Sequence, residues 1–585
     1  MTRFFEVLER DGPARLGDLR LSESVTTPAL VDDVLVDGGS RWPGEPAEPT
    51  ADEDVLTVLP HRTMPAGTEE AVRTAFSEGP PAIDGPSAAV VSSVDPSPVE
   101  GVDAYVVGDI QSVVGHGRAM WEALVRVREA VPADTAVVAS GVATPAAVPT
   151  LVYAGVDLVD ETRAVVAGAR GRYLTVDGAT RLEELTELPC SCPACRTDRE
   201  SFSREDCIEH NRLALQSSLA TVRERIRAGR LRDYLEGQAR HVAWCTATLR
   251  GLDEQWAYLE ERTPMLRSAE ITAATDDTLR RVEIQRYADR VTSRYRNRFA
   301  DWPLVLVPCS AHKPYSESQS HRRFHQAIQW RGHVVSLTSP LGVVPQELET
   351  TYPAQHYDAV VTGRWSESER AFVTSVLERY LAGADYPRIV AHVPEGGYRD
   401  IVEAALTDRD CPVTYTVADH PTDDASLERL EAALDGVSAY PKRTREHNTV
   451  RAIADYCFGE GAGDELFGAI QTTGQYPRLQ VRDEGGEQLA TMVRRYGTLS
   501  LTMAGLERWL ESPVPVRRVR IDDFVPHGSV LAPGVVEADP AIRVGDEVVI
   551  EGPAALAIGR AAMFGREMTE SSRGVACDVR HVRER

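Results

Sequence analysis

The sequence predicts a multidomain α/β protein: a (β/α) barrel-like N-terminal domain, a second α/β domain, a small α+β domain and a C-terminal β-barrel. Three observations favour this fold class. A chain of 585 residues exceeds what one hydrophobic core supports. Short apolar runs alternate with helix-length stretches between about residues 104 and 186, and again between about 304 and 393. From 517 to 585 the chain instead shows many short strands separated by turn residues.

The composition is that of a soluble globular protein with an acidic bias. The formal net charge is −25, and of the 64 basic residues only Lys313 and Lys442 are lysines. This acidic, lysine-poor composition resembles that of halophilic proteins, so we interpret the acidity as an adaptation that keeps the protein soluble in concentrated salt. No apolar run reaches transmembrane length, and the first residues lack a signal-peptide core. We therefore expect a cytoplasmic protein without a membrane partner.

The N-terminal part predicts a hairpin followed by alternating strands and helices. Residues 4–17 alternate in polarity and turn at Asp11-Gly12-Pro13, whereas the Pro- and Asp-rich stretch 43–67 predicts loops. The strands are expected at 104–107, 136–138 and 156–159, and the helices at about 115–131 and 144–154. Such alternation predicts a parallel sheet or barrel.

A metal site is predicted by the spacing of three cysteines and one histidine, Cys190, Cys192, Cys195 and His210. Three thiolates and one imidazole complete tetrahedral zinc without an open position, which makes the zinc structural. Cys207 is the less favoured ligand, since His210 follows one turn later on the same helix. The alternative is a cysteine cluster without a metal.

The helix that carries His210 is predicted to begin at Ser203, because Asp206 follows three residues later in a capping pattern. From there to about residue 292 the pattern is helix after helix.

Several of these segments together resemble the tRNA-guanine transglycosylase family. They are the opening hairpin with Thr27–Leu30, Gly155–Asp160, Arg172–Thr175 and the Cys-x-Cys-x-x-Cys motif followed by His-Asn. The resemblance implies a (β/α) barrel with zinc and places the family's nucleophilic aspartate at Asp160. The family's Ser-Gly-Gly-Phe-Gln pocket segment is absent, and its nearest counterpart is Ile83–Ser87.

The most chemically dense stretch follows the apolar run Leu304–Val307, which stops at Pro308 and predicts a buried strand that ends at a sheet rim. The loop behind it carries Cys309, Lys313, Tyr315, Ser318 and His321. A lysine that persists where arginine replaces nearly all others indicates a need for ammonium chemistry. The alternative is a structural role for each residue: a packed thiol, a solvated lysine and a core or capping histidine.

Further apolar runs at 333–345, 357–363 and 388–393 predict the rest of the second α/β domain. Because Thr338 ends one of these strands, we expect the loop behind it, including Glu347, to share a cleft with the Cys309 loop. The predicted domains are 1–240 (barrel-like, with zinc), 241–295 (helical connector), 296–436 (α/β catalytic), 437–512 (small α+β) and 513–585.

The last domain resembles the PUA domain, a small β-barrel that binds structured RNA. From Val516 onward ten arginines face eleven acidic residues, so this stretch escapes the acidic bias of the chain. A domain with that balance is the one expected to contact phosphate.

Barrel, central loop and PUA-like domain together resemble the archaeosine synthases over nearly the whole chain. The resemblance implies a transferase that acts on 7-cyano-7-deazaguanine already present in the D-loop of tRNA. It implies addition of an amine such as lysine to the nitrile, with a radical S-adenosylmethionine partner that cleaves the adduct. We also expect a homodimer.

The loop residues suit this chemistry. Cys309 would add to the nitrile as a soft nucleophile, and His321 or Tyr315 would protonate the nitrogen. Lys313 would lower the pKa of the thiol or orient the substrate. Two alternatives stay open: a transglycosylase that exchanges guanine through Asp160, and a non-catalytic tRNA-binding scaffold.

Overall fold

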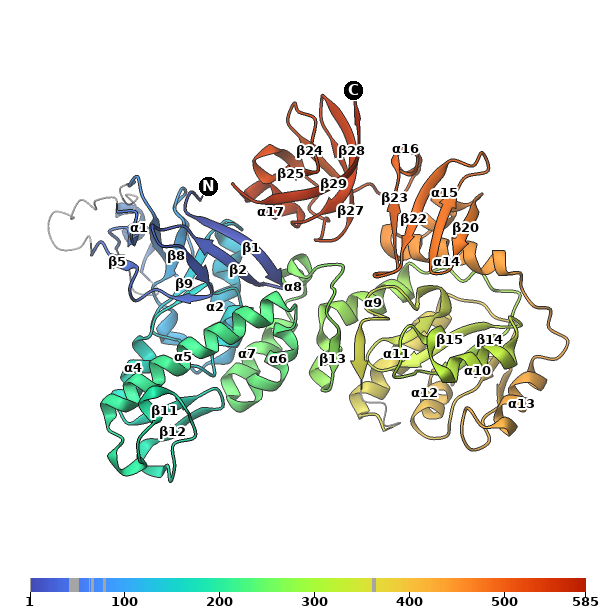
Figure 1. The fold of residues 1–585 in the computed structure, drawn as a ribbon, viewed down its shortest axis with the longest axis horizontal. Helices are drawn as coiled ribbons and strands as arrows, with labels where there is room; N and C mark the ends of the chain where they lie inside the picture. Colours follow the sequence, from blue (N-terminus) through green and yellow to red (C-terminus); the bar gives the residue numbers. More distant parts are fainter. Residues whose placement is uncertain are drawn as a thin grey trace. The chain divides into compact units, whose positions relative to one another are not determined.

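The computed structural model describes residues 2–40, 52–62, 64, 68–76, 80, 82–359 and 364–585. They form two compact units (Figure 1). The first unit comprises residues 1–264 with 530–543 and 563–576, and the second comprises 265–529 with 544–562 and 577–585. The loop predicted over 43–67 and the end of the run 357–363 lie partly outside the described residues. No described helix is long and apolar enough to span a membrane.

The first unit opens with the predicted hairpin. Strands β1 (Phe5–Asp11) and β2 (Ala14–Leu19) pair antiparallel around the Asp11-Gly12-Pro13 turn, and β3 (Val25–Thr27) adds a third strand. Phe5 and Leu19, which lie opposite each other at the open end of this hairpin, are fully buried. Because side chains alternate along a strand, Phe5 and Val7 face the core whereas Leu8 is exposed.

A curled, seven-stranded parallel sheet forms the body of this unit and confirms the barrel-like fold class. Its order is β4-β10-β9-β8-β7-β6-β5. The strands are β4 (Ala29–Leu30), β5 (Leu35–Asp37), β6 (Leu56–Val58), β7 (Ser87–Val91), β8 (Ala104–Val107), β9 (Ala136–Ala139) and β10 (Leu158–Val159). Helices α2 (Gly117–Ala130), α3 (Val148–Tyr153) and α4 (Thr162–Ala169) follow the last three strands.

Strand β6 corrects the sequence interpretation, because residues 56–58 lie inside the stretch expected to be a loop. The run Leu56-Thr57-Val58 is too short to stand out against its Asp- and Pro-rich flanks, yet all three residues are buried between β5 and β7. Tertiary pairing therefore overrides the local composition.

A buried ion pair joins the hairpin to this sheet. Arg15 donates to both carboxylate oxygens of Asp157 at 2.7 Å, and Asp157 also accepts the Val137 amide at 2.8 Å. Both charged side chains are almost fully buried. Burial, followed by repulsion from Arg15, lowers the pKa of the neighbouring Arg128 to about 9, and the Asp157 charge opposes that shift. The Asp157 carboxylate thus offsets one positive charge within a buried cluster of guanidinium groups.

We predict that Asp157→Asn destabilises the first unit by about 3–5 kcal/mol, because it leaves a buried guanidinium without its counter-ion. Calorimetry of the full chain and hydrogen exchange at the β9 amides measure the effect. The matched control is Glu122→Gln, which removes a pair with the exposed Arg118 and should cost no more than about 0.5 kcal/mol. Equal melting of the two variants would show that the buried pair is dispensable.

Downstream of α4, a small hairpin and a helical layer complete the first unit. Strands β11 (Arg172–Thr175) and β12 (Gly178–Arg181) precede the long helix α5 (Arg204–Arg227). Ser203 and Asp206 form a reciprocal capping box at its start, which confirms the predicted helix start. Helices α6 (Leu231–Gln238), α7 (Ala243–Asp253) and α8 (Trp256–Arg262) follow.

The second unit is built around a five-stranded sheet of order β16-β15-β14-β18-β19, in which only β16 is antiparallel. Its strands are β14 (Leu304–Pro308), β15 (His333–Thr338), β16 (Gly342–Pro345), β18 (Ile389–Ala391) and β19 (Val413–Tyr415). Helices α10 (Gln319–Ile328) and α13 (Asp424–Ala433) pack on the face that carries Val305 and Val307.

Leu304 and Leu306 point to the opposite face of this sheet. That face packs against α9 (Val282–Ser293), α11 (Glu367–Ala382) and α12 (Gly397–Ala405). Because both faces are covered, β14 reads as an unbroken apolar run instead of an alternating one.

The rest of the second unit contains two antiparallel-rich sheets. Helices α14 (Lys442–Phe458), α15 (Ala462–Phe467) and α16 (Met503–Glu511) accompany β20 (Gln471–Gln475), β21 (Arg478–Arg482), β22 (Gln488–Val493) and β23 (Thr498–Leu501). The last sheet contains the series β29-β28-β27-β24, with β24 at Arg518–Ile521, β27 at Glu547–Glu551, β28 at Ala555–Ala561 and β29 at Val575–Glu584.

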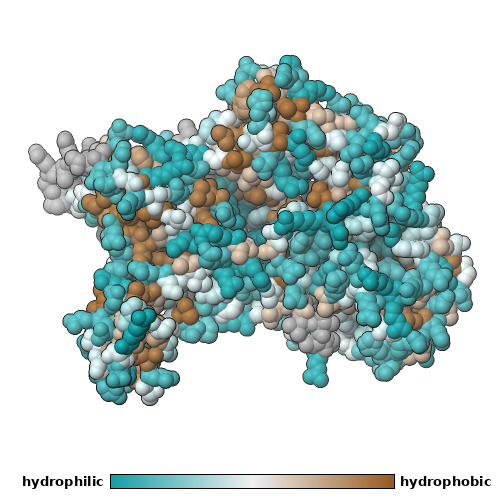
Figure 2. Space-filling view, viewed as in Figure 1, coloured by the Kyte–Doolittle hydropathy of each residue, from teal (hydrophilic) through white to brown (hydrophobic). Residues whose placement is uncertain are grey.

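The stretch expected to be a purely helical connector also contains a strand. Strand β13 (Ile271–Ala273) pairs parallel with β17 (Tyr357–Ala359). Hydrophilic residues cover most of the molecular face in Figure 2, as the charged composition predicts.

Candidate functional site

The four predicted metal ligands converge in the first unit. The ligand atoms of Cys190, Cys192, Cys195 and His210 all lie within 4.8 Å of one another. His210 Nδ1 lies 3.5 Å from Cys192 Sγ and 3.4 Å from Cys195 Sγ. The other ring nitrogen, Nε2, donates to the Leu174 carbonyl on β11 at 2.8 Å. The lone pair on Nδ1 is therefore free to bind a metal ion. This cluster could hold a metal ion.

Cys207 is not part of that cluster, as the helix register predicts. Its thiol is fully buried and donates to the Arg172 carbonyl at 3.4 Å. Burial raises the pKa of Cys207 to about 11, so the group stays a thiol at neutral pH. The Tyr173 ring stacks on His210 with centroids 3.8 Å apart, which holds the imidazole in place.

Asp160 lies at the carboxyl end of β10, where its carboxylate accepts the Gly141 amide at 2.8 Å and the Thr162 amide at 3.2 Å. Asp32 lies close by and accepts the Glu161 amide at 3.0 Å. Burial is the main reason why the pKa of Asp32 rises to about 6, and the charges of Glu161 and Asp160 add to it. An acidic group that can hold a proton near neutral pH thus accompanies Asp160.

The proposed counterpart of the pocket segment does not reach this place. Asp84 precedes β7, and its carboxylate pairs with Arg3 in an exposed contact. All strands of the sheet are parallel. A residue before β7 therefore lies at the amino ends of the strands, and a residue after β10 lies at their carboxyl ends. Ile83–Ser87 therefore cannot shape a base pocket around Asp160.

In the second unit, Cys309 directly follows β14, and its backbone amide donates to the Leu337 carbonyl of β15 at 3.1 Å. Its half-buried thiol lies 3.2 Å from the hydroxyl of Tyr398, at the start of α12. The thiol therefore lies at the carboxyl rim of the parallel strands, where α/β folds place reactive groups.

Lys313 comes from the same loop and lies over the ring of Tyr357, with Nζ 3.8 Å from the centroid. Its one hydrogen bond to the described residues is a long one to the Ala311 carbonyl, at 3.4 Å. Burial lowers the pKa of Lys313, and attraction to the nearby Cys309 only partly opposes that shift. The amine is thus biased towards its neutral form beside the thiol.

Three hydroxyl groups form a chain beneath the lysine. The Tyr357 hydroxyl is 2.6 Å from Thr338 Oγ1, and it makes a short hydrogen bond with the Tyr315 hydroxyl. Burial raises the pKa of both tyrosines, so both phenols stay protonated. Tyr315 thus reaches the Lys313 side chain through Tyr357.

His321 and Ser318 hold the loop in shape. His321 is almost fully buried, its Nε2 donates to the Pro308 carbonyl at 3.0 Å, and burial lowers its pKa to about 3. The neutral ring stacks on Tyr315 at 5.0 Å. The Ser318 hydroxyl caps α10 by accepting the His321 amide at 3.2 Å.

The expectation for Glu347 is wrong. Glu347 pairs with His333, at the first residue of β15, at 2.9 Å, because the antiparallel strand β16 carries the chain back to the other end of the sheet. The acid that reaches the loop is Glu349, which accepts the Ser316 amide at 2.8 Å. Neither Tyr357 nor Tyr398 was predicted as a site residue from the sequence. The one sequence signal for them is that each is an aromatic residue at the start of a strand or helix.

Four family models match successive parts of the chain. A queuine tRNA-ribosyltransferase model matches residues 89–243, and a domain of unknown function matches 284–434, which contains the Cys309 loop. The patch-forming domain C2 of tRNA-guanine transglycosylase matches 448–515, and the PUA domain matches 519–583. This combination, with the half-barrel and its Cys/His cluster, defines a protein of the transglycosylase type with a PUA domain.

Full-length relatives narrow this class. The chain is 58% identical to archaeosine synthase from Haloferax volcanii and 40% identical to archaeosine synthase subunit alpha from Methanosarcina acetivorans, with all of each chain covered. It is 27% identical to tRNA-guanine(15) transglycosylase from Methanothermobacter thermautotrophicus, over 73% of this chain and 63% of that one. The chain belongs to the archaeosine synthase family.

We predict that acylation of Lys313 by a small amine reagent follows a pH profile with its midpoint below the ordinary lysine value of about 10.4, because burial disfavours the ammonium form. The chain has only two lysines, so peptide mass spectrometry resolves both. The exposed Lys442 is the internal reference. A Lys313 profile centred at or above the ordinary value would contradict the assigned environment.

Proposed function

We propose that this chain is a tRNA-modifying transferase of archaeosine biosynthesis that adds an amine to the nitrile of 7-cyano-7-deazaguanine in the D-loop of tRNA. Its membership of the archaeosine synthase family supports the reaction class. The observation that carries the assignment of the site is the Cys309 thiol beside Lys313, whose pKa burial lowers, at the carboxyl rim of β14. The target base has to leave the tRNA stack to reach them.

The nitrile carbon is a weak electrophile, so a soft nucleophile is needed. In the proposed first step, Cys309 Sγ bonds to the nitrile carbon and the nitrile nitrogen gains the thiol proton, which forms a thioimidate. Tyr398, in contact with Sγ, is placed to pass that proton. In the second step the donor amine bonds to the same carbon and Cys309 leaves as a thiol. The product is an amidine, and atoms balance without a redox step.

Lys313 is assigned to proton exchange with the substrate nitrogen, because its amine is the group in the loop whose pKa burial brings towards neutrality. His321 and Tyr315 are the proton donors named from the sequence. Tyr315 is linked to the site by its hydrogen bond to Tyr357, whereas the Nε2–H of His321 is already donated to the Pro308 carbonyl. We therefore assign His321 and Ser318 to positioning of the loop.

The amine donor is proposed to be lysine or another nitrogen donor. A radical S-adenosylmethionine partner is proposed for cleavage of the adduct, in keeping with the relative that is named as an alpha subunit. The PUA domain at 519–583 is proposed to bind tRNA. The homodimer also stays a proposal.

The metal cluster is proposed to hold zinc in a structural role. Three cysteines and one histidine are a donor set that zinc prefers, and together they leave no coordination position open for a substrate. The Leu174 carbonyl accepts the Nε2–H of His210, which is the kind of hydrogen bond that orients a metal-binding histidine.

One observation favours a second activity. Asp160 lies beside Asp32, whose pKa of about 6 suits proton transfer in a base exchange. The mass spectrum of tRNA nucleosides from a deletion strain separates the two functions. Accumulated nitrile base supports the synthase, whereas unmodified guanine at that position supports the transglycosylase.

We predict that Cys309→Ala lowers conversion of nitrile-bearing tRNA by about 10³-fold or more at unchanged tRNA affinity, because the lost bond exists only along the reaction path. Liquid chromatography and mass spectrometry of nucleosides measure conversion, and filter binding measures affinity. Near wild-type conversion by Cys309→Ala would leave the free amine as the only nucleophile.

Lys313→Arg is predicted to lower conversion by about 10²-fold, since a guanidinium keeps the charge but cannot exchange a proton. Lys442→Arg is the matched control, because Lys442 is exposed and its ion-pair partner among the residues that the structure describes is Glu446, at 3.5 Å. Equal activity of the two variants would remove Lys313 from the mechanism.

We predict that Cys192→Ala loses one equivalent of bound zinc and folds less stably, because structural zinc contributes directly to folding. Cys207→Ala removes a buried thiol from α5, the helix that also carries His210, and the variant should keep the metal. Metal analysis and limited proteolysis of residues 172–210 report the two effects. A stable, metal-free Cys192→Ala protein would refute the structural role.

A further inference from the structure

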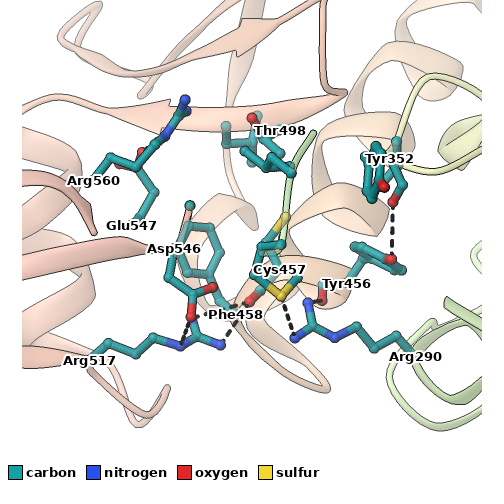
Figure 3. A pocket seen from close by; sticks show the side chains of 15 residues that line it. Arg290, Tyr352, Tyr456, Cys457, Phe458, Thr498, Arg517, Asp546, Glu547 and Arg560 are labelled. Carbon is teal, nitrogen blue, oxygen red and sulfur yellow. Dashed lines mark hydrogen bonds and ion pairs between the residues drawn. The ribbon is translucent and has the colours of Figure 1, made fainter. Parts of the chain in front are cut away.

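The second unit contains a small cavity that the proposed reaction does not use (Figure 3). It has a volume of about 30 Å³ and is lined by parts of α9, α14, β23, β27 and β28. Its charged lining residues are Arg290, Arg517, Arg560, Asp546 and Glu547. All of its lining residues lie in one compact unit, and the residues of the Cys309 loop are not among them.

Both acidic groups of the lining already have cationic partners. Asp546 pairs with Arg517 at 3.2 Å, as a dashed line in Figure 3 shows. Glu547 makes a short ion pair with Arg580 and lies 3.9 Å from Arg560. Each of these carboxylates thus forms its ion pair with an arginine other than Arg290, and Asp546 acts on Arg290 only as a weaker, more distant charge.

Arg290 is a buried cation with only neutral partners among the described residues. Its side chain donates to the Tyr456 carbonyl at 3.4 Å and to the Met265 sulfur at 3.3 Å. The residue is 5% exposed. Burial lowers its pKa to about 10, and the positive charge of Arg294 adds to the shift. A buried charge without a counter-ion is costly, so the site favours an added anion.

Two further hydrogen-bond donors of the lining lack an acceptor. Thr498 Oγ1 and Arg560 Nε are buried and have no hydrogen-bond partner among the described residues. Buried donors of this kind are normally satisfied by protein or by a bound species. Together with Arg290 they surround the cavity with excess donors and positive charge, which is the environment of an anion acceptor.

We propose that this cavity binds a small monatomic anion, chloride in the first place. A volume of about 30 Å³ exceeds the roughly 10–15 Å³ that one water needs, so a single small ion has room in the cavity. The anion neutralises Arg290 and accepts from Thr498. It thereby stabilises the packing of α9 and α14 against the last sheet.

An anion that binds only the folded state raises stability by mass action. The experiment melts the full-length protein in sodium gluconate that is replaced stepwise by sodium chloride at constant sodium. The wild type is expected to gain about 2–4 °C in Tm and then to saturate. Arg290→Met is expected to lose this chloride-dependent gain, whereas Arg478→Gln, at an exposed position on β21, keeps it.

Thr498→Val tests the second donor, since it keeps the side-chain shape and removes the hydroxyl. It is expected to raise the chloride midpoint about fivefold, as the loss of one hydrogen bond implies. Bromide-soaked crystals are expected to show an anomalous peak within hydrogen-bond distance of Arg290. The proposal fails if the wild type melts alike in chloride and gluconate, if Arg290→Met responds like the wild type, or if the bromide peak is absent.

Discussion

The hydrogen bond from His321 Nε2 to the Pro308 carbonyl closes the loop on which the proposed active site depends. It ties the first turn of α10 back to the last residue of β14, so that Cys309 and Lys313 are held in a loop fixed at both ends. Burial lowers the pKa of His321 to about 3, so the imidazole is neutral and donates this bond from its Nε2–H tautomer. A histidine that stays uncharged over the physiological range keeps this closure independent of pH.

The same exclusion of water acts on the lysine, with a different outcome. Burial disfavours the cationic form of both His321 and Lys313. His321 donates its proton to a backbone carbonyl and holds the loop, whereas the contacts of Lys313 with the described part of the chain are a tyrosine ring and one long hydrogen bond to a carbonyl. A site with few hydrogen bonds to an ammonium group is one in which the neutral amine is accessible. One physical cause thus separates a positioning residue from a reactive one.

Local patterns were enough to predict the hairpin, the β14 strand and the metal cluster, because each depends on neighbours within a short stretch. Contacts between distant segments were not predictable in this way. Tyr398 meets Cys309 across 89 residues, and Tyr357 meets Tyr315 across 42. Glu347 was misplaced because the periodicity of β16 does not reveal that it runs antiparallel. The five domain boundaries stay predictions.

The buried arginines follow one rule in both units, although their environments differ. In an acidic chain with few lysines, positive charge enters the core as guanidinium, which is less strongly hydrated than ammonium and rarely loses its proton. In the first unit Asp157 meets Arg15 with both oxygens and offsets the cluster around Arg128. In the second unit Arg517 pairs with Asp546 and Arg580 pairs with Glu547, two acids of the lining that Arg290 shares. Where the chain supplies too few carboxylates for its buried guanidinium groups, the remaining charge has to be balanced by solvent or by a bound anion, and the shape of the surrounding cavity decides which.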